Sequence, residues 1–430
     1  PGHRRNPMPT SPPAAAHCMK PAGSQREFAV EVVTQLREAG YEALWAGGCV
    51  RDQLLGIDPK DYDVATSARP EQIRQLFGRR RTLAIGAAFG VISVLGRKPH
   101  EPIEVATFRS DGTYRDGRHP ETVSYTTAEH DAERRDFTIN GLFFDPLAEE
   151  VIDYVGGEQD LRDGLIRAIR NPRERFTEDK LRMLRAVRFA ATFEFEIEAD
   201  TLDAIQEMAP EVASVSAERI GMELRRMLLD ENRAVAMRLL RETGLLGTIV
   251  PELMQLNDAQ FQQVIRAADR LNAPGLPVVF AALLVPLENP ELGREIAKRV
   301  RFTNKEAERT GWLLSRVQDL RGADTKAWPG IQRLLVHPGG TELVDLYEAR
   351  LGREDDAIQF CRAKLALPAE ELNPPPLLDG SDLIEHGVRP GPRFKKMLAE
   401  VRDAQLLDEV GTRDEALELV DKLIHESRRR

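Results

Sequence analysis

The stretch AGGCVRDQLLGIDPKDYDVAT, residues 46–66, decides how the first third of this chain folds. An apolar segment, Ala43–Ala46, is expected to form a short strand that runs into Gly47 and Gly48. A helix that contains Arg51 should follow. The backbone N–H groups of the glycine turn and the helix dipole then favour an anion, and Arg51 adds a positive charge. A plain tight turn is the alternative. No GK[ST] ending accompanies the glycines, which argues against a P-loop ATPase.

The same stretch contains two carboxylates, Asp61 and Asp63, just before a run of apolar and small residues. Residues two apart on a strand point to the same face, so both carboxylates should project together. Two like charges side by side repel one another, which is tolerable when a cation lies between them. Mg²⁺ prefers carboxylate oxygens and nucleotide phosphates, so the pair indicates a magnesium site. Taken alone, such a pair is more often a solvated acidic turn.

A third carboxylate, Glu104, lies in the alternating segment IEVAT, residues 103–107. We expect this segment to be a strand that follows another strand, residues 91–95, after a connection rich in glycine and proline. If the strand that contains Glu104 is a neighbour of the strand near Asp63, the carboxylates complete a two-metal site for in-line phosphoryl displacement. In isolation Glu104 is an ordinary strand glutamate.

The apolar period changes along the chain, and this change predicts the domain organisation. The first part mixes expected helices and strands, including a helix opened by Ser67 and Pro70. Beyond residue 157 the apolar residues recur at helical spacing, with no convincing strand. The expected fold class is α+β, with a small mixed sheet in the head and an all-α remainder. The expected division is a disordered leader (1–24), a head (25–155), a helical neck (156–232), a helical body (233–340) and a helical tail (341–430).

Composition bounds the class of protein. At 430 residues the chain is long enough for two to four packed units, and 42% hydrophobic and 30% charged residues are ordinary for a globular protein. No apolar run approaches the roughly 20 residues needed to span a bilayer. Three widely spaced cysteines fit neither a disulfide framework nor a zinc site, and indicate a reducing cytoplasm. The net charge is −10, but residues 162–188 carry eight arginines and one lysine, a local basic surface suited to nucleic acid.

Three more motifs follow downstream: RRDFTING (134–141), DYVGGEQDLRDGLIRAI (153–169) and TEDKLRMLRAVRFA (177–190). With the glycine turn, the aspartate pair and EVATFR (104–109), this ordered set resembles the class II tRNA nucleotidyltransferase and poly(A) polymerase family, in the polymerase-β-like nucleotidyltransferase superfamily. Six motifs in the same order make chance agreement improbable. The resemblance covers residues 40–230 closely and the remainder only as a helical tail.

The resemblance implies roles for individual residues. The metal-binding acids and the third acidic position would be Asp61, Asp63 and Glu104. The segment that holds the triphosphate would be Gly47, Gly48 and Arg51. The motif linked to phosphate and ribose contacts would be Arg135, Asp136 and Asn140. The residues that face the incoming base would be Asp179 and Arg182, with Arg185 and Arg188 further along the same helix. A downstream helix motif that braces this region would be Arg219 and Glu223.

Physical chemistry supports a base-reading role for Asp179 and Arg182. We expect them on one helix, where positions three apart are neighbours on the surface. One side chain offers only acceptors and the other only donors, so together they can read the Watson–Crick edge of a base. A surface ion pair is the alternative, and the upstream motifs favour base reading over it. Arg188 winds about half-way round the helix from Asp179.

One segment departs from the family pattern. AEHDAE, residues 128–133, is acidic at a place where relatives commonly have a leucine. His130 and Asp131 by themselves suggest a phosphohydrolase HD site, but no companion His and Asp set has suitable spacing. We therefore interpret the segment as a solvated helix end.

The resemblance implies an enzyme that adds nucleotides from CTP and ATP to the 3′ end of tRNA, with Mg²⁺ as cofactor and release of pyrophosphate. The head would be catalytic, the neck would recognise the base and the tail would bind RNA. The long segment 110–133 resembles the mobile loop of enzymes that add the terminal A, which disfavours CC-only addition. Addition of the whole CCA end, or of its terminal A alone, is expected, and poly(A) synthesis is the alternative within the family. A non-catalytic RNA-binding protein is the alternative outside it, and the intact carboxylates and RRD motif argue against that reading.

Overall fold

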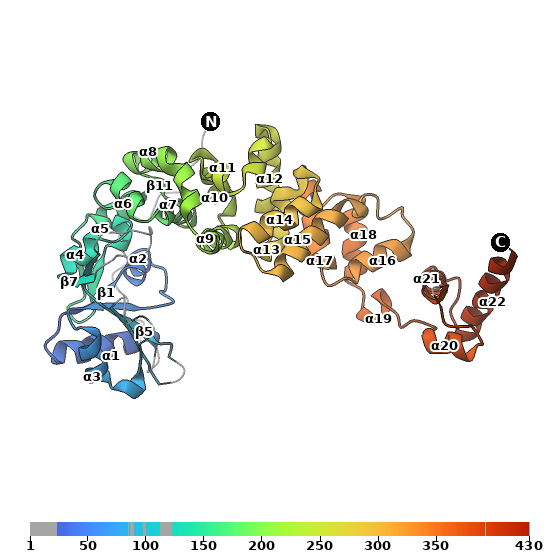
Figure 1. Ribbon diagram of the computed structural model, residues 1–430, viewed down its shortest axis with the longest axis horizontal. Coiled ribbons are helices and arrows are strands. Elements are labelled where there is room, and N and C mark those ends of the chain that lie inside the picture. Colours follow the sequence, from blue (N-terminus) through green and yellow to red (C-terminus); the bar gives the residue numbers. More distant parts are fainter. Residues whose placement is uncertain are drawn as a thin grey trace. The chain divides into compact units, whose positions relative to one another are not determined.

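The computed structural model describes residues 24–84, 86, 90–97, 100–111, 123–391 and 393–429. The expected disordered leader lies outside these residues, except that Ser24 is the N-cap of the first helix. The chain divides into two compact units, residues 1–179 and 180–430 (Figure 1). The division of the chain into head, neck, body and tail stays a prediction.

The first unit contains a mixed sheet of seven strands in the order β3-β4-β5-β2-β1-β8-β9. Only β2 and β5 run parallel to one another, and the other neighbouring pairs are antiparallel. This arrangement confirms the expected α+β head. The strands are β1 (Ala43–Ala46), β2 (Asp63–Thr66), β3 (Thr82–Leu83), β4 (Val91–Val94), β5 (Ile103–Thr107), β8 (Phe143–Asp145) and β9 (Glu150–Ile152).

Two amphipathic helices pack against the sheet. Helix α1 (Gln25–Glu38) contacts β1 and β2, and helix α3 (Pro70–Phe77) contacts β4 and β5. The buried side chains of α1 recur at the spacing of one helical face: Phe28, Ala29, Val32, Val33 and Leu36. Helix α3 begins at Pro70 as expected, but its N-cap is Arg69 and not Ser67. The hydroxyl of Ser67 instead accepts the backbone N–H of Glu42 at 2.9 Å, so the serine is committed to a neighbouring turn.

The first unit contains further elements outside the seven-stranded sheet. They are α2 (Gly48–Leu54), η1 (Arg79–Arg81), β6 (Arg109–Asp111), β7 (Val123–Tyr125), α4 (Ala128–Glu133), η3 (Thr138–Asn140), α5 (Gly157–Asp163), β10 (Leu165–Ile166) and α6 (Pro172–Glu178). Strands β6 and β7 pair antiparallel. Of the segment that resembles the mobile loop, residues 112–122 lie outside the described residues.

The second unit is helical apart from the two-residue strand β11 (Glu196–Ile197). Its first half comprises α7 (Leu181–Phe193), α8 (Ala199–Met208), η4 (Ala209–Ser214), α9 (Ala217–Leu229), α10 (Arg233–Glu242), α11 (Leu245–Ile249), η5 (Pro251–Gln255), α12 (Asp258–Arg270), α13 (Leu276–Leu284) and η6 (Val285–Leu287). Helix α13 is apolar on all sides and contacts α9, α12, α15 and α17, which makes it the centre of this region.

The second half of this unit comprises α14 (Pro290–Arg299), α15 (Asn304–Arg316), η7 (Val317–Leu320), α16 (Trp328–Leu335), α17 (Gly340–Leu351), α18 (Asp356–Leu365), α19 (Ala369–Leu372), α20 (Gly380–Glu385), α21 (Arg393–Leu406) and α22 (Arg413–Arg429). The last three helices have an apolar core of their own, formed by Leu378, Leu383, Met397, Val401, Ala416 and Val420. Among the described helices, none combines the length and apolar character that a membrane span requires.

Candidate active site

The two aspartates lie at the beginning of β2, where the chain enters the sheet. Asp63 is the first residue of the strand, and Asp61 precedes it. Exposed and buried side chains nevertheless alternate through this stretch: Asp61 and Asp63 are exposed, and Tyr62 and Val64 are buried. The ring of Tyr62 packs edge-on against Trp45 with centroids 4.8 Å apart. This packing keeps both carboxylates on the open side of the sheet.

The third carboxylate lies on the adjacent strand. Asp63 is the register partner of Glu104 in the parallel pair β2–β5, so the predicted adjacency of the two strands is confirmed. Both side chains are exposed. In a parallel pair, partners in register project from the same face of the sheet, which sets Glu104 beside Asp63.

The surroundings of Asp63 destabilise the charged form of its carboxyl group. Its pKa is raised to about 6, first because surrounding protein excludes water and then because Glu104 repels a second negative charge. Arg135 opposes this effect, and Asp61 adds to it. A cation between these carboxylates relieves the repulsion, so the oxygen-only donor set fits a hard divalent metal ion.

The described side chains do not form a closed metal cage: no three His, Cys, Asp or Glu residues among them converge on one point. Mg²⁺ does not require such a cage, because it keeps several waters and is held by one or two carboxylates together with substrate phosphates. The arrangement of Asp61 and Asp63 suits that mode of binding.

Gly47 occupies a position that only glycine fills without strain. Its φ is +72°, and a Cβ there would lie 2.7 Å from Nη1 of Arg135. The guanidinium of Arg135 therefore lies directly against the turn that leads from β1 into α2. Gly48 is the first residue of α2. The structure thus brings the glycine turn and the RRD motif together, although some 88 residues separate them in sequence. A contact between segments so far apart depends on the tertiary fold and not on local sequence.

A buried chain of hydrogen bonds runs from Arg51 to Asp136. Nη1 of Arg51 donates to Oδ1 of Asn140 at 2.6 Å, and Nδ2 of Asn140 donates to Oδ1 of Asp136 at 2.9 Å. Nε and Nη2 of Arg51 both donate to Oδ1 of Asp52. Arg51, Asp136 and Asn140 are each at most 8% exposed. These side chains hold one another in place, so Arg51 links the glycine helix to η3.

Asp131 is a site residue that the sequence interpretation missed. The segment interpreted as a solvated helix end contains this carboxylate, but Asp131 is only 1% exposed. Its Oδ1 accepts Nε and Nη2 of Arg134 at 2.9 and 2.7 Å, and its Oδ2 accepts Nη2 of Arg135 at 3.0 Å. Burial raises the pKa of Asp131, but Arg135 and Arg134 outweigh that effect and hold it below its ordinary value. The i,i+3 and i,i+4 spacing to the two arginines was the available signal.

The helix expected to contain both Asp179 and Arg182 is interrupted. Helix α6 ends at Glu178, Asp179 is its C-cap in an extended conformation (φ −148°, ψ 104°), and α7 begins at Leu181. Asp179 and Arg182 therefore do not share one helix, and the i,i+3 argument for them was wrong. Asp179 immediately precedes the N-terminus of α7, where the positive end of the helix dipole favours a carboxylate.

Three arginines predicted to face the nucleotide lie on α7 in the second unit. Arg182 is 8% exposed, and the guanidinium of Arg185 lies over the ring of Phe189 at 5.2 Å. Nε of Arg188 donates to Oε2 of Glu223 at 2.6 Å. Glu223 on α9 is buried, which fits the bracing role that the resemblance implied for it. Burial lowers the pKa of Arg188 and Glu223 opposes that effect, so the pair is held together by its charges.

The small mixed sheet, with Asp63 and Glu104 in register on parallel strands beside a glycine turn, defines the catalytic head of a nucleotidyltransferase. A family model described as the poly A polymerase head domain matches residues 43–167. A second model, described as the probable RNA and SrmB-binding site of polymerase A, matches residues 194–256.

One relative and one solved structure are similar to nearly the whole chain, and a second relative is similar to about half of it. The CCA-adding enzyme of Limosilactobacillus reuteri is 34% identical over 402 residues, 89% of this chain and 93% of the relative. The CCA-adding enzyme of Enterococcus faecalis is 45% identical over 48% of this chain and 50% of the relative. The crystal structure of the Bacillus stearothermophilus CCA-adding enzyme in complex with CTP has a TM-score of 0.76 and 28% identity, covering 96% of this chain and all of that one. The chain therefore belongs to the CCA-adding enzyme family.

Proposed function

We propose that this protein adds CCA, or its terminal A, to the 3′ ends of tRNA, using CTP and ATP and releasing pyrophosphate. The observation that carries the proposal is the parallel register of β2 and β5, which sets Asp63 beside Glu104. These carboxylates lie in a chain that is 34% identical to a CCA-adding enzyme along almost all of that enzyme's length. Neighbouring carboxylates that can hold divalent metal ions suit an in-line phosphoryl displacement, the reaction that joins a nucleotide to a 3′-hydroxyl.

The head residues divide the chemistry between them. Asp61 and Asp63, with Glu104 beside them, would hold Mg²⁺, which when bound supplies a Lewis acid at the α-phosphate and at the attacking 3′-hydroxyl. Nη1 and Nη2 of Arg135 each donate one hydrogen bond within the protein and each retain a second N–H for a phosphate oxygen. The backbone of Gly47 permits this guanidinium to lie against the turn, where the triphosphate is proposed to bind.

Base selection is assigned to side chains of the protein, because no template strand is involved. We assign acceptors to Asp179 and donors to Arg182, a complementary pair for the Watson–Crick edge of C or A. Arg185 and Arg188 continue along α7 as further nucleotide contacts. The neighbouring helices of the second unit, and the tail over residues 341–430 in particular, are proposed to hold RNA through its phosphates.

The test is the incorporation of labelled CTP and ATP, each alone and both together, into tRNA that ends at the discriminator base, at CC or at CCA. Addition of two C and one A, followed by arrest, is the expected result. Addition of A to the CC end only would identify an A-adding enzyme, and unlimited addition of A would identify a poly(A) polymerase, an outcome that the head-domain match keeps open. No incorporation with Mg²⁺, Mn²⁺ or any of these RNAs would overturn the enzymatic proposal.

A control variant separates chemistry from folding. Asp61 is exposed and precedes its strand, so Asp61→Ala should melt like the parent protein and incorporate no nucleotide. Activity of that variant with Mg²⁺ would show that the metal ligands are misassigned.

Cytoplasmic location is part of the same proposal, and the buried free thiols of Cys49 and Cys361 fit a reducing compartment.

A further inference from the structure

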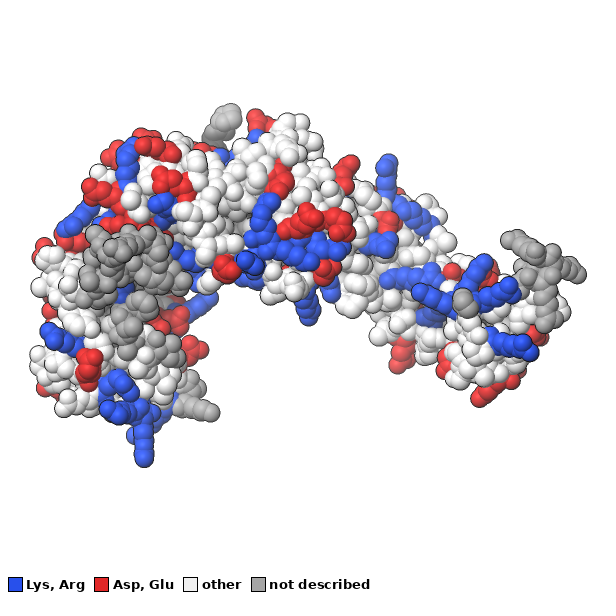
Figure 2. Space-filling view, in the orientation of Figure 1, with Lys and Arg blue, Asp and Glu red and all other residues white. Residues whose placement is uncertain are grey.

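A hollow of about 460 Å³ lies on the surface of the first unit, along α3 and at the beginning of η1. We refer to it as the α3–η1 hollow. Figure 2 shows Lys and Arg side chains gathered at the end of the first unit where Figure 1 places α3. The lining consists of Pro70, Glu71, Arg74, Gln75, Gly78 and Arg79. Three of these residues are spaced by four positions, so the hollow follows one face of the helix.

The hollow lies on the opposite side of the sheet from the catalytic carboxylates. Val64, Ile92 and Val105 are register partners across β2, β5 and β4, and each is at most 1% exposed. They alternate along the strands with Asp63 and Glu104, which are exposed on the other face. Helix α3 contacts β4 and β5, so it covers the buried face. A ligand in the α3–η1 hollow is therefore remote from the reacting phosphate.

The two arginines of the hollow are not engaged by the protein. Across the part of the chain that the structure describes, the guanidinium groups of Arg74 and Arg79 have no hydrogen bond or ion pair. Nε of Arg74 is buried and lacks an acceptor, and Arg79 is exposed. An unsatisfied buried donor costs free energy, which a ligand oxygen can recover after a small rotation of the side chain. An anion can therefore bind both arginines without breaking a contact within the protein.

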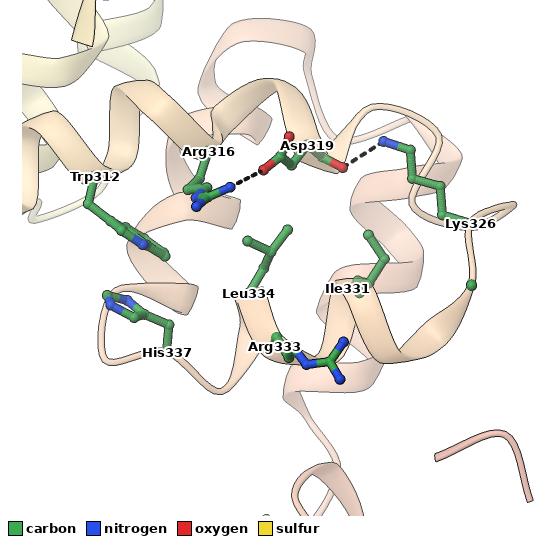
Figure 3. A pocket seen from close by; sticks show the side chains of 10 residues that line it. Trp312, Arg316, Asp319, Lys326, Ile331, Arg333, Leu334 and His337 are labelled. Atoms are coloured by element: carbon green, nitrogen blue, oxygen red, sulfur yellow. Dashed lines mark hydrogen bonds and ion pairs between the residues drawn. The ribbon is translucent and has the colours of Figure 1, made fainter. Parts of the chain in front are cut away.

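A hollow of similar size in the second unit shows the contrast (Figure 3). Its three cations are all engaged by the protein. Nη1 of Arg316 donates to Oδ2 of Asp319 at 3.3 Å, and Nζ of Lys326 donates to the backbone oxygen of Asp319 at 2.8 Å. Arg333 is paired with Asp403. An anion in that hollow would have to compete with these contacts, which have no counterpart at Arg74 and Arg79.

The other two arginines of η1 do not line the hollow. A 3₁₀ helix has three residues per turn, so the side chains of Arg79, Arg80 and Arg81 diverge by about a third of a turn each. Nε of Arg81 donates to the backbone oxygen of Leu95 at 3.4 Å, which draws this side chain toward the end of β4. Arg80 is exposed. Both add positive charge near the hollow without contributing to its lining.

The lining suits a phosphate group. Guanidinium groups present paired N–H donors that match the oxygens of a phosphate, and the amide of Gln75 offers two more. Two guanidinium groups outnumber one carboxylate, that of Glu71. Gly78 keeps the hollow open, because a Cβ there would meet no atom within 4 Å. The lining includes no aromatic ring on which a base could stack, which disfavours a nucleic-acid strand.

We propose that the α3–η1 hollow binds a small phosphate-bearing anion at a site separate from the catalytic carboxylates. Arg74 and Arg79 each hold one phosphate of a linked pair, and Gln75 donates to the same ligand. The volume of about 460 Å³ is many times the roughly 30 Å³ that one water occupies, so two linked phosphates fit. This site is independent of the proposed function, because it uses the other face of the sheet.

The test is calorimetric titration of pyrophosphate into the full-length protein with a chelator present, which removes metal-dependent binding at the carboxylates. The parent protein should show a site that Arg74→Gln with Arg79→Gln weakens roughly tenfold or more, because two charged donors are lost. Arg79→Glu alone changes an exposed position and should cause a similar loss, which guards against misfolding of the double variant. Arg80→Gln removes an exposed arginine of the same short helix and should bind like the parent protein.

Parallel titrations identify the source of the phosphate. Binding of orthophosphate and pyrophosphate without AMP identifies an inorganic anion, and binding of AMP as well identifies the phosphate of a nucleotide; either result supports the site. Unchanged pyrophosphate binding in the double variant, or an equal loss in Arg80→Gln, would overturn it. A loss of tRNA affinity in the double variant with unchanged pyrophosphate binding would assign the arginines to RNA instead.

Nucleotide incorporation separates this site from the proposed function. The double variant should extend tRNA like the parent protein, because Asp63 and Glu104 lie on the other face of the sheet. Loss of incorporation by a folded double variant would place the arginines in the reaction and overturn a separate site. A parent protein that binds pyrophosphate through Arg74 and Arg79 but extends no RNA would refute only the proposed function.

Discussion

Nη2 of Arg135 donates to Oδ2 of Asp131 at 3.0 Å, and Asp131 is almost completely buried. The other oxygen of the carboxylate accepts Arg134, so one buried charge orients both arginines of the RRD motif. Nη1 of Arg135 in turn lies 2.7 Å from the position that a Cβ on Gly47 would occupy. Asp131 thus orients a guanidinium that lies against the glycine turn and acts electrostatically on the carboxylate of Asp63.

Replacement of that carboxylate should affect both stability and catalysis. We expect Asp131→Asn to lower the free energy of unfolding by about 3 kcal/mol, because it leaves two arginines beside a neutral amide. We also expect kcat/KM for ATP and CTP to fall roughly 100-fold, since Arg135 loses its fixed orientation. Steady-state kinetics and urea unfolding measure the two effects. Glu129→Gln removes an exposed charge from the same helix and should leave both unchanged. Parent-like kinetics in Asp131→Asn would exclude the positioning role.

The raised pKa of Asp63 predicts how activity and stability depend on pH. Because this pKa is about 6, incorporation should fall as the pH drops through 6, where the protonated carboxyl no longer ligates a cation. The folded pKa exceeds the ordinary value of 3.8, so the folded state binds the proton more tightly. Its contribution to stability is therefore present below pH 4 and is lost as the pH rises through about 6.

Whether the charged carboxylate of Asp63 destabilises the folded protein can be tested without substrate. In the presence of a chelator, Asp63→Asn should unfold with a free energy higher by on the order of 1 kcal/mol at pH 8, a value reduced for solvent screening of the exposed side chain. The difference should vanish at pH 4, while the variant should be inactive at both pH values. A variant less stable than the parent at pH 8 would mean that the carboxylates do not repel one another.

Gly47→Ala should damage the site more than the fold. The substitution places a Cβ at positive φ and 2.7 Å from Nη1 of Arg135, which we expect to cost about 1–3 kcal/mol and to displace the guanidinium. Gly40→Ala is the matched control, because Gly40 also has a positive φ (+86°) but no atom near its added Cβ. Thermal unfolding should show a loss in both variants, and nucleotide incorporation should fall only in Gly47→Ala. Equal activity of the two variants would contradict the proposed contact.

Glu223, the buried acid of α9, should stabilise the fold of the second unit. Glu223 is 3% exposed and accepts Nε of Arg188 at 2.6 Å and Nη1 of Arg226 at 3.0 Å. Glu223→Gln should lower the free energy of unfolding by about 3 kcal/mol, because the buried Arg188 loses its counter-charge. Glu218→Gln, on the same helix with an exposed pair to Arg301, should change it by less than about 1 kcal/mol. Denaturant unfolding of both variants measures the two losses in unfolding free energy, and equal losses would show that burial of the ion pair does not matter.

The periodicity of apolar residues was sufficient to predict strands and helices wherever neighbouring residues in the sequence decide the structure. The strand at Ala43–Ala46 follows from a short apolar run, the strand at Ile103–Thr107 from alternation, and the helix from Pro70 from first-turn preferences. The same reasoning failed at Asp179, because the apolar period begins only at Leu181 and says nothing about the turn before it. It also failed at Asp131, because a charged residue in an acidic segment is usually solvated, and only tertiary packing buries this one.

The sequence by itself determined the α+β head, the helical remainder and the order of the motifs, since these depend on periodicity and residue type within short windows. It also determined that Asp61 and Asp63 face one side, because alternation of exposed and buried residues is a local property. Only the tertiary structure decided that Glu104 lies beside Asp63 and that Arg135 lies against Gly47. These contacts join segments about 40 and 90 residues apart. Many pairings of such distant segments are possible, and strand register and core packing, not a local signal, select the one that forms.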